Sequence, residues 1–458
     1  MVWGDTWYQP VLFYLTAAAL KLLPLTETSV RLPAALLGGL IAPLLLYLLV
    51  MRLMGHRLVA LTAALLLALS PAEVILSRQA LDYICPLPFV LGWLYGLVSW
   101  QQTRRGGWAL AAGLALGVGF YSYIASWVLM PIYLAMSGWI FYRAEPPRAR
   151  PALLTCVGCA IPILVIVPWL WANPAMLQQT MKRYQMSDQE QASLLKGTAV
   201  TSAGTVIATA KAYASFFDPT MLFVRGGPVM TTSTQRTGAF LVPMALLVPV
   251  GLYALWIRRE RDGWSVLVLA GLLTAPIPAA IKGEAYMIQR AMYLAVFACL
   301  ISAYGLEWLR CSRSRLRVVA AVLLLAAPVQ FAMFYRDYFT HYKLRSAFYY
   351  DAVTFADVAT VLLQSDAPAF YLEESLDDVD VKWRFYATKF DRLEVLNRTH
   401  YFGGDGVDLR DVQPGSLLVI YVDQAKLTAL AATKQWTLMK VIRDVDDREA
   451  AAILRRVS

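Results

Sequence analysis

Ten long apolar runs decide what this chain can fold into. Each has about 17 to 22 residues, the length that a helix needs to cross the hydrocarbon core of a bilayer. They lie at residues 32–51, 58–76, 84–101, 108–124, 126–142, 152–171, 239–257, 264–281, 288–309 and 317–334. Only 16% of the residues are charged, against roughly a quarter in a soluble domain. The sequence therefore predicts an α-helical polytopic membrane protein with about ten transmembrane helices.

Basic residues occupy every second connection between these runs. The clusters are Arg52–Arg57, Arg104–Arg105, Arg143–Arg150, Arg258–Arg261 and Arg310–Arg317. Because cytoplasmic loops are enriched in Lys and Arg, these connections are predicted to be cytoplasmic, and the long loop 172–238 is predicted to lie outside. The same clustering accounts for the net charge of +10. Nucleic acid is therefore not a predicted partner.

The chain divides into three predicted regions. Residues 1–31 form an outer juxtamembrane segment, in which residues 10–24 are too short to span and are read as an interfacial helix. Residues 32–334 form the multi-helix membrane domain. From Tyr335 the composition becomes charged and mixed, so residues 335–458 are predicted to be a small extracytoplasmic α/β domain.

Short patterns in this last region predict its elements. Strands are predicted at Ala369–Leu372, Ser416–Val422 and Thr437–Ile442, and helices around Val353–Leu363, Gln424–Ala432 and Arg448–Arg455. No Gly-rich phosphate loop and no acidic metal motif occurs among them. A binding or scaffolding role is the default expectation.

A polar interruption, SPAEVILSRQALDYICP, separates two apolar runs at Ser70–Pro86. Arg78 and Asp82 are four residues apart, so on a helix they share one face and can pair. A charged pair in lipid is costly, and it is expected at the membrane boundary or in a water-filled cavity. Taken alone, this stretch is better explained by a topology anchor at a helix end.

The cysteine and histidine residues do not form a recognisable metal, redox or catalytic motif. Cys156 and Cys159 form a CVGC inside an apolar run with no second pair nearby, which favours small residues for helix packing over a redox or metal motif. His56, His341 and His400 are scattered. Acid–base chemistry is therefore expected from carboxylates.

Several collinear segments resemble one family. They are Trp7–Leu12 (WYQPVL), Leu25–Leu36 (LTETSVRLPAAL), Leu69–Phe89 (LSPAEVILSRQALDYICPLPF), Gly117–Pro131 (GVGFYSYIASWVLMP), Phe216–Gly227 (FFDPTMLFVRGG), Ala275–Arg290 (APIPAAIKGEAYMIQR) and Tyr335–Tyr342 (YRDYFTHY). In this order they resemble the glycosyltransferase C superfamily, in the branch of protein O-mannosyltransferases and lipid A aminoarabinose transferases. The chain beyond about residue 345 carries little of the resemblance.

The resemblance implies a function and its site residues. Relatives transfer a hexosyl or pentosyl group from a polyprenyl-phosphate carrier to an acceptor on the outer face, here expected to be that of the bacterial inner membrane. Arg78 and Arg290 would hold the donor phosphate, and Asp82 would orient Arg78 or contact a metal or the sugar. Glu284 would contact the acceptor or the sugar. The use of a divalent metal stays open, as does the acceptor, whether protein, lipid or glycan.

The sequence departs from the family pattern in two places. Relatives begin with a helix and an outer loop whose acidic pair includes the main catalytic carboxylate, and this sequence is expected to start after both. Asp5, in a Gly-Asp that fits the later part of that loop, is the second catalytic candidate. Gly226-Gly227 stands where relatives have Gly-Asp.

Three functional hypotheses follow from these features. The chain is a shortened glycosyltransferase, or a degenerate relative that binds lipid-linked sugar or assists cell-envelope glycan assembly, or a transporter. A transporter places polar groups at the bilayer midplane, whereas here they gather at the ends of the runs. The retained Arg78, Asp82 and Arg290 favour the enzyme.

Overall fold

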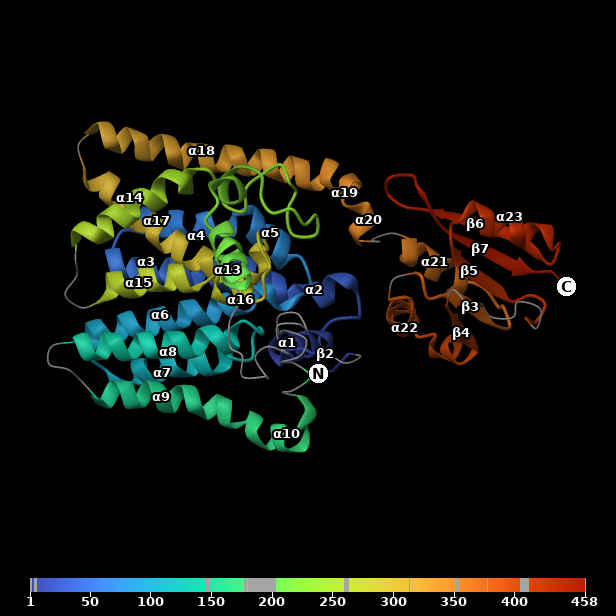
Figure 1. The fold of residues 1–458 in the computed structure, drawn as a ribbon, viewed down its shortest axis with the longest axis horizontal. Helices are drawn as coiled ribbons and strands as arrows, with labels where there is room; N and C mark the ends of the chain where they lie inside the picture. The colour runs from blue at the N-terminus through green and yellow to red at the C-terminus, as the bar shows by residue number, and fades with distance from the viewer. Residues whose placement is uncertain are drawn as a thin grey trace. The chain divides into compact units, whose positions relative to one another are not determined.

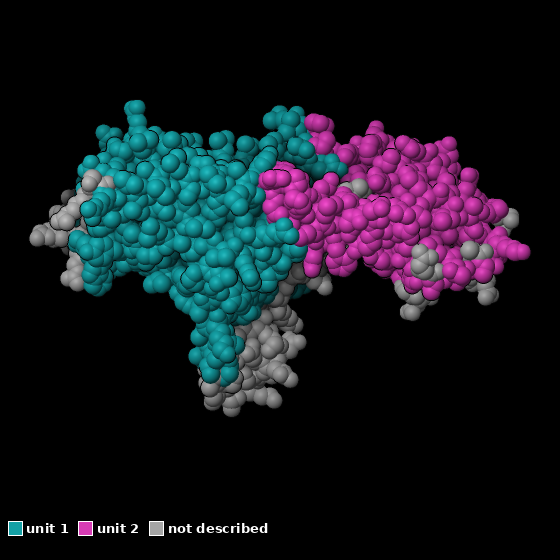
Figure 2. Space-filling view, turned by 90° about the horizontal axis from the view of Figure 1, so that it is seen from above, with its two compact units in different colours: residues 1–23, 27–335 teal, residues 24–26, 336–458 magenta. Residues whose placement is uncertain are grey.

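The computed structural model describes residues 2–3, 6–144, 149–176, 179, 203–258, 263–312, 314–350, 354–376, 378–403 and 412–457. The chain divides into two compact units, shown in separate colours in Figure 2. The first comprises Met1–Leu23 and Glu27–Tyr335, and the second comprises Pro24–Thr26 and Arg336–Ser458.

The first unit is helical (Figure 1). Up to the long loop its elements are β1 (Val2–Trp3), β2 (Thr6–Trp7), α1 (Pro10–Leu20), α2 (Glu27–Leu36), η1 (Leu37–Ile41), α3 (Ala42–Met54), α4 (Arg57–Ala68), α5 (Pro71–Ser77), η2 (Asp82–Ile84), α6 (Pro86–Thr103), α7 (Gly106–Gly119), α8 (Ser126–Arg143), α9 (Ala149–Leu164) and α10 (Ile166–Ala172). After it come α13 (Ala203–Ser215), η3 (Thr220–Val224), α14 (Pro243–Arg258), α15 (Trp264–Thr274), α16 (Ile277–Ile281), η4 (Ile288–Ala291), α17 (Tyr293–Cys311) and α18 (Ser314–Phe339). The elements η1 and η3 are π-helical, and η2 and η4 are 3₁₀ turns.

Every predicted apolar run is helical over most of its length. Within the described residues, six helices are long and apolar enough to cross a membrane: Glu27–Met54, Asp82–Thr103, Ala149–Ala172, Trp264–Ile281, Tyr293–Cys311 and Arg315–Phe339. The bent pair α4 and α5 makes a seventh if it counts as one span. The protein is thus a helical, membrane-type chain, and the figure of ten spans stays a prediction.

The predicted run 58–76 is not one straight helix. Its two halves, α4 and α5, meet at 58°. Ser70 has an extended backbone, and Pro71 begins α5 without an N–H to donate to the preceding turn. The next amide, Ala72 N–H, donates instead to the carbonyl of Ala239 at 3.0 Å. A tertiary contact therefore supports the bend.

The core of the first unit surrounds α17. Nearly all of its side chains from Tyr293 to Leu309 are buried, and it packs against α14, α15, α4 and α6. Inside this core the Trp264 indole N–H donates to the Tyr304 hydroxyl at 2.9 Å and links α15 to α17. The helix therefore provides a fixed base for η4, which precedes it directly.

Glycines bring α7 and α9 into backbone contact. Gly113 and Gly117 lie one turn apart on α7 and face the main chain of α9, while Gly158 of α9 faces the main chain of α7. Cys159, next to Gly158, is buried, whereas Cys156 is exposed, and both are free thiols. The interpretation of the CVGC as small residues for helix packing therefore holds for Gly158 and Cys159, whereas Cys156 lies outside the contact.

This contact predicts the effect of Gly113→Ala. The added methyl would overlap the Thr155 carbonyl oxygen, which is main chain and cannot move away cheaply. We expect a loss of about 1–3 kcal/mol of stability, as for other overpacked sites. Thermal unfolding of the detergent-solubilised protein measures it. Gly107→Ala, also on α7 but with nothing within 4 Å, is the control. Equal unfolding temperatures for the two variants would contradict the close packing.

The second unit is a five-stranded sheet with helices on both faces. Its elements are α19 (His341–Arg345), α20 (Ala347–Tyr350), α21 (Thr354–Leu363), β3 (Phe370–Glu373), α22 (Val379–Lys389), η5 (Leu393–Arg398), β4 (Thr399–Phe402), β5 (Leu417–Tyr421), α23 (Gln424–Ala432), β6 (Trp436–Arg443) and β7 (Glu449–Arg456). The strand order is β4-β3-β5-β7-β6, with β3 parallel to β4 and β5 and with β7 antiparallel to β5 and β6.

One predicted element of this unit is wrong. The segment Arg448–Arg455, predicted as a helix, is strand β7. Its side chains enter two cores, because Ala451 and Ile453 pack with α21 and α22 while Ala452 and Leu454 pack under α23. A strand buried on both faces shows a continuous apolar run rather than an alternating one. The strand β4 and helix α22 were not predicted.

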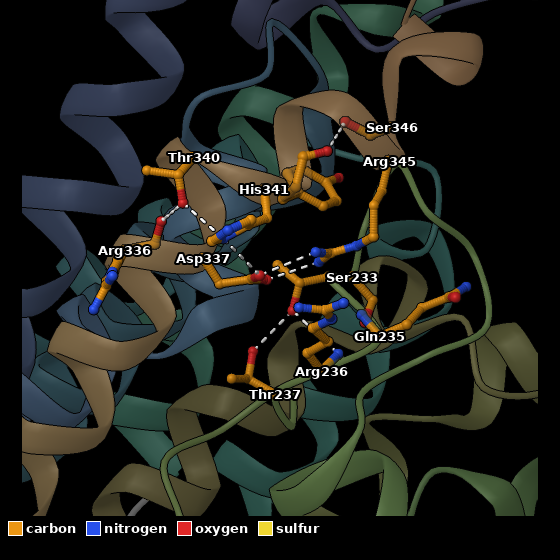
Figure 3. Close-up of polar contacts among 12 residues, drawn as sticks. Ser233, Gln235, Arg236, Thr237, Arg336, Asp337, Thr340, His341, Arg345 and Ser346 are labelled. Carbon is orange, nitrogen blue, oxygen red and sulfur yellow. Dashed lines mark hydrogen bonds and ion pairs between the residues drawn. The ribbon is translucent and has the colours of Figure 1, made fainter. Parts of the chain in front are cut away.

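Polar contacts link the two helices that meet within Tyr335–Tyr342, one of the segments that resemble the family (Figure 3). Asp337, in the last turn of α18, accepts two hydrogen bonds from Arg345 at 3.0 and 2.7 Å. The Nδ1 atom of His341 lies 3.9 Å from the same carboxylate. The rings of Tyr338 and Tyr342 stack with centroids 5.1 Å apart. These contacts hold α19 against the end of α18.

Candidate functional site

The polar stretch that follows α5 is not a continuous helix. The helix α5 ends at Ser77, Arg78 is its exposed C-cap, and Asp82 begins the separate 3₁₀ turn η2. The prediction that Arg78 and Asp82 share one helix face is therefore wrong. The chain turns between them because Leu81 adopts an extended conformation before η2.

A distant segment fixes this stretch in place. The side-chain amide of Gln79 donates to the carbonyl of Thr231 at 2.5 Å. Together with the bond from Ala72 N–H to Ala239, this ties both ends of α5 to residues 225–240. The position of Asp82 thus depends on a loop far away in the sequence.

Arg290 lies on η4 within a network of ionic and hydrogen-bonding contacts. Its Nη1 atom donates to the Tyr123 hydroxyl at 2.9 Å, and its Nε atom lies 2.8 Å from Glu284 Oε2. Lys282 Nζ lies 2.7 Å from the other oxygen of the same carboxylate. The side chains of Arg290 and Glu284 are 20% and 19% exposed, so both are held at the edge of the interior.

Asp82 and Tyr83 complete this cluster. The guanidinium of Arg290 lies over the Tyr83 ring, 5.7 Å from its centroid, and the Tyr83 and Tyr123 rings meet edge to face at 5.5 Å. The charge of Arg290 also acts on the Asp82 carboxylate. The structure therefore brings together Asp82, Arg290 and Glu284, which the sequence analysis named only as separate candidates.

The surroundings keep Arg290 charged. It precedes the candidate span Tyr293–Cys311. Burial alone would lower the pKa of this guanidinium, but the phenols of Tyr123 and Tyr83 and the Glu284 carboxylate outweigh burial and raise the pKa above its ordinary value. A permanent positive charge beside a cavity can bind an anion such as a phosphate.

Two cavities lie on either side of the turn between α7 and α8. The smaller, of about 130 Å³, is lined by Tyr123, Ile124, Ala125, Val128, Pro278, Ala279, Ile281, Lys282, Glu284 and Arg290. The larger, of about 590 Å³, is lined almost wholly by apolar and aromatic side chains: Tyr8, Gln9, Pro10, Val11, Tyr14, Leu15, Phe89, Val118, Tyr121, Trp127, Val165, Ile166, Trp169 and Met176. Tyr121 donates to the Pro162 carbonyl at 2.7 Å and thereby anchors the turn to α9.

The sequence missed three members of the cluster. Tyr83, Tyr123 and Lys282 contact Arg290 or Glu284, but no spacing rule connects these positions. Two of them stand beside residues that were singled out, since Tyr83 follows Asp82 and Lys282 lies two residues before Glu284. Asp5, the other catalytic candidate, lies outside the described residues.

The described residues of this cluster do not form a divalent metal site. Within the described part of the chain, no three His, Cys, Asp or Glu side chains gather as ligands. Glu284 already faces two cations, Lys282 and Arg290, which compete with any metal for its oxygens. The chemistry of the cluster therefore rests on Arg, Lys, Tyr and carboxylate groups.

Part of the chain matches a known protein family. Residues 9–171, about a third of the chain, match the family model described as dolichyl-phosphate-mannose-protein mannosyltransferase. This region includes Arg78, Asp82 and Tyr123 and ends before Glu284 and Arg290. No curated protein matches the chain. The match supports the resemblance to the glycosyltransferase C superfamily and points to a membrane glycosyltransferase of the mannosyltransferase type.

Proposed function

We propose that this protein is a membrane glycosyltransferase that moves a sugar from a polyprenyl-phosphate donor to an acceptor at the outer face of the bacterial cell membrane. The observation that carries the proposal is the Arg290 guanidinium, held by Tyr123 and Glu284 beside the Asp82 carboxylate and lining a cavity. A cation and a carboxylate side by side are what transfer from a sugar phosphate requires.

Arg290 is assigned to the donor phosphate. Its contacts to Tyr123 and Glu284 use part of the five N–H donors of a guanidinium, and the remainder suit a phosphate oxygen pair. As the bond from the sugar to the phosphate breaks, negative charge grows on the leaving polyprenyl phosphate. A cation fixed in advance stabilises that charge without having to rearrange. Lys282 adds a second positive charge nearby.

Asp82 is assigned to the acceptor. In the proposed step an acceptor hydroxyl oxygen attacks the anomeric carbon, the bond from that carbon to the phosphate oxygen breaks, and the hydroxyl proton passes to the Asp82 carboxylate. The products are the glycosylated acceptor and polyprenyl phosphate. Glu284 acts on this step indirectly, because its carboxylate fixes Arg290 and Lys282. Arg78, exposed at the end of α5, remains a candidate for the same donor phosphate.

The apolar cleft is assigned to the polyprenyl chain. Its volume of about 590 Å³ falls within the range of ligand sites, and its lining suits a hydrocarbon chain. Tyr121 and Trp127 line this cleft, whereas Tyr123 and Val128 line the cavity of Arg290. One short turn therefore borders both the proposed lipid site and the proposed phosphate site.

A donor-binding assay tests this assignment with Val118→Trp. The larger side chain would fill part of the cleft, and we expect the concentration of donor at half-maximal rate to rise about tenfold, a loss of about 1.4 kcal/mol of binding. The assay uses the full chain in proteoliposomes, radiolabelled mannosyl-phosphoryl-polyprenol, and photo-crosslinking by a diazirine analogue of polyprenyl phosphate. Leu114→Trp, one turn earlier on α7 and outside the cleft lining, is the matched control.

The same assay distinguishes sugar transfer from the alternative function, the binding of lipid-linked sugar without transfer. Crosslinking in the cleft without transfer of label to any lipid or protein acceptor of the membrane fraction would favour a degenerate relative that binds lipid-linked sugar. A result with no crosslinking and no transfer would overturn both functions. Equal donor requirements for Val118→Trp and Leu114→Trp would remove the polyprenyl chain from this cleft.

A further inference from the structure

Glu73 is a buried carboxylic acid that the proposed reaction does not use. It lies on α5, the second half of the bent pair, and is 0% exposed. Both of its side-chain oxygens are buried without a hydrogen-bond partner in the described part of the chain. Such a group in a membrane protein has a functional or positional reason, because burying it is costly.

The contacts around Glu73 are close and apolar. A methyl group on Gly38 of η1 would lie 2.7 Å from Glu73 Oε1 and 2.6 Å from a side-chain carbon of Ile84. The carboxyl group therefore fits only because residue 38 has no side chain. From α17, the Cys299 thiol is close enough to interact electrostatically with Glu73.

No described cation balances a charge on Glu73. The elements packed against α5 are η1, α2, α4, η2 and η4, and α17 contributes Cys299. Their charged or titratable residues are Glu27 and Arg31 on α2, Arg57 at the far end of α4, Asp82 and Tyr83 on η2, Arg290 on η4, and Tyr293, Cys299, Tyr304, Glu307, Arg310 and Cys311 on α17. No ion pair between Glu73 and a described residue is present, and Arg290 pairs with Glu284.

The π-helix η1 packs against α5 and presents no charged side chain to Glu73. Its residues, Leu37–Ile41 (LGGLI), have no polar side chains, so the polar atoms it presents are main-chain atoms. The i→i+5 pattern of a π-helix interrupts the normal ladder of the surrounding α-helix and often marks a functional site.

We propose that Glu73 is a proton-binding site inside the membrane domain, occupied at neutral pH, whose bound proton lets α5 pack against η1. The uncharged acid avoids the cost of burying a carboxylate among the apolar side chains of η1 and α17. Because α5 leads directly into Arg78 and Asp82, the proton also fixes the segment that carries them. The inference rests on packing in the first unit and does not depend on the sugar-transfer reaction.

Infrared spectroscopy of the full-length protein in lipid tests this proposal. At pH 8, far above the ordinary range for a glutamic acid, we expect a carbonyl band of an un-ionised carboxyl group that shifts in D₂O and is lost in Glu73→Gln. Glu73→Leu should lose the same band, which covers the case in which the Gln variant does not fold. Asp337→Asn, which removes a carboxylate paired with Arg345, is the control and should leave the band unchanged.

A pair of glycine variants tests the location of this group. Gly38→Ala should shift the frequency of the band, because the new methyl displaces the carboxyl group. Gly39→Ala, its neighbour in η1 with nothing within 4 Å, should leave the frequency unchanged. If Glu73→Gln and Glu73→Leu both retain the band at pH 8, Glu73 is ionised and the proposal fails. An unchanged band frequency in Gly38→Ala would also contradict the proposal.

Discussion

Arg290→Ala is expected to lower the rate of sugar transfer by about 100- to 1,000-fold, the usual cost of removing one fixed group that stabilises developing charge. The guanidinium is held by Tyr123 and Glu284 and lines the cavity, so no neighbouring side chain can take its position without rearrangement. The measurement is the initial rate with radiolabelled mannosyl-phosphoryl-polyprenol, normalised to folded protein. Arg290→Lys should recover part of the rate, because it restores the charge but not the bidentate geometry.

The control for this prediction is Arg310→Ala. Arg310 pairs with Glu307 at 2.8 Å, near the opposite end of α17, so the variant removes a comparable Arg–Glu pair away from the cavity. Its rate should stay within about twofold of wild type, as expected for a partly exposed ion pair. If Arg290→Ala and Arg310→Ala have equal rates, Arg290 does not bind the donor phosphate. Equal losses of folded protein in the two variants would instead reveal a structural role.

The sequence predicted individual residues of the site but not how they are arranged. Asp82 was singled out in a polar interruption between apolar runs, and Arg290 and Glu284 were chosen from the family resemblance. The structure places all three in one cluster. Their arrangement could not be derived, because the cluster joins three segments around residues 82, 123 and 284–290. Periodicity describes neighbours along one helix, which is why it suggested a face shared by Arg78 and Asp82 where the chain in fact turns.

The fold was predictable where hydrophobicity alone decides it. Apolar runs marked the helices of the first unit, because a backbone in lipid must satisfy its own hydrogen bonds. The bend at Pro71 depends on a hydrogen bond to Ala239, which no local pattern reveals. In the second unit, β7 has the sequence EAAAILRR, whose alanines favour a helix. Burial against both α21 and α23 overrides that preference.

Asp82→Asn is the second substitution expected to have a large effect. The amide keeps the shape of the side chain and cannot accept the proton of an acceptor hydroxyl, so we expect kcat to fall by about 100- to 10,000-fold. The donor concentration at half-maximal rate should change little, since Arg290 and the apolar cleft stay intact. The same transfer assay, run over a range of donor concentrations, gives both quantities.

Two comparisons decide what an Asp82 effect means. Asp337→Asn removes a carboxylate paired with Arg345 in the second unit and should leave kcat unchanged. Arg78→Ala tests the other candidate in the same stretch, and a contact with donor phosphate would raise the donor requirement as well as lower the rate. Wild-type turnover in both Asp82→Asn and Arg78→Ala would show that the stretch between α5 and α6 takes no part in the reaction. A fall in kcat for Asp82→Asn alone would leave Arg290 as the principal phosphate contact, with Asp82 as the group that receives the proton.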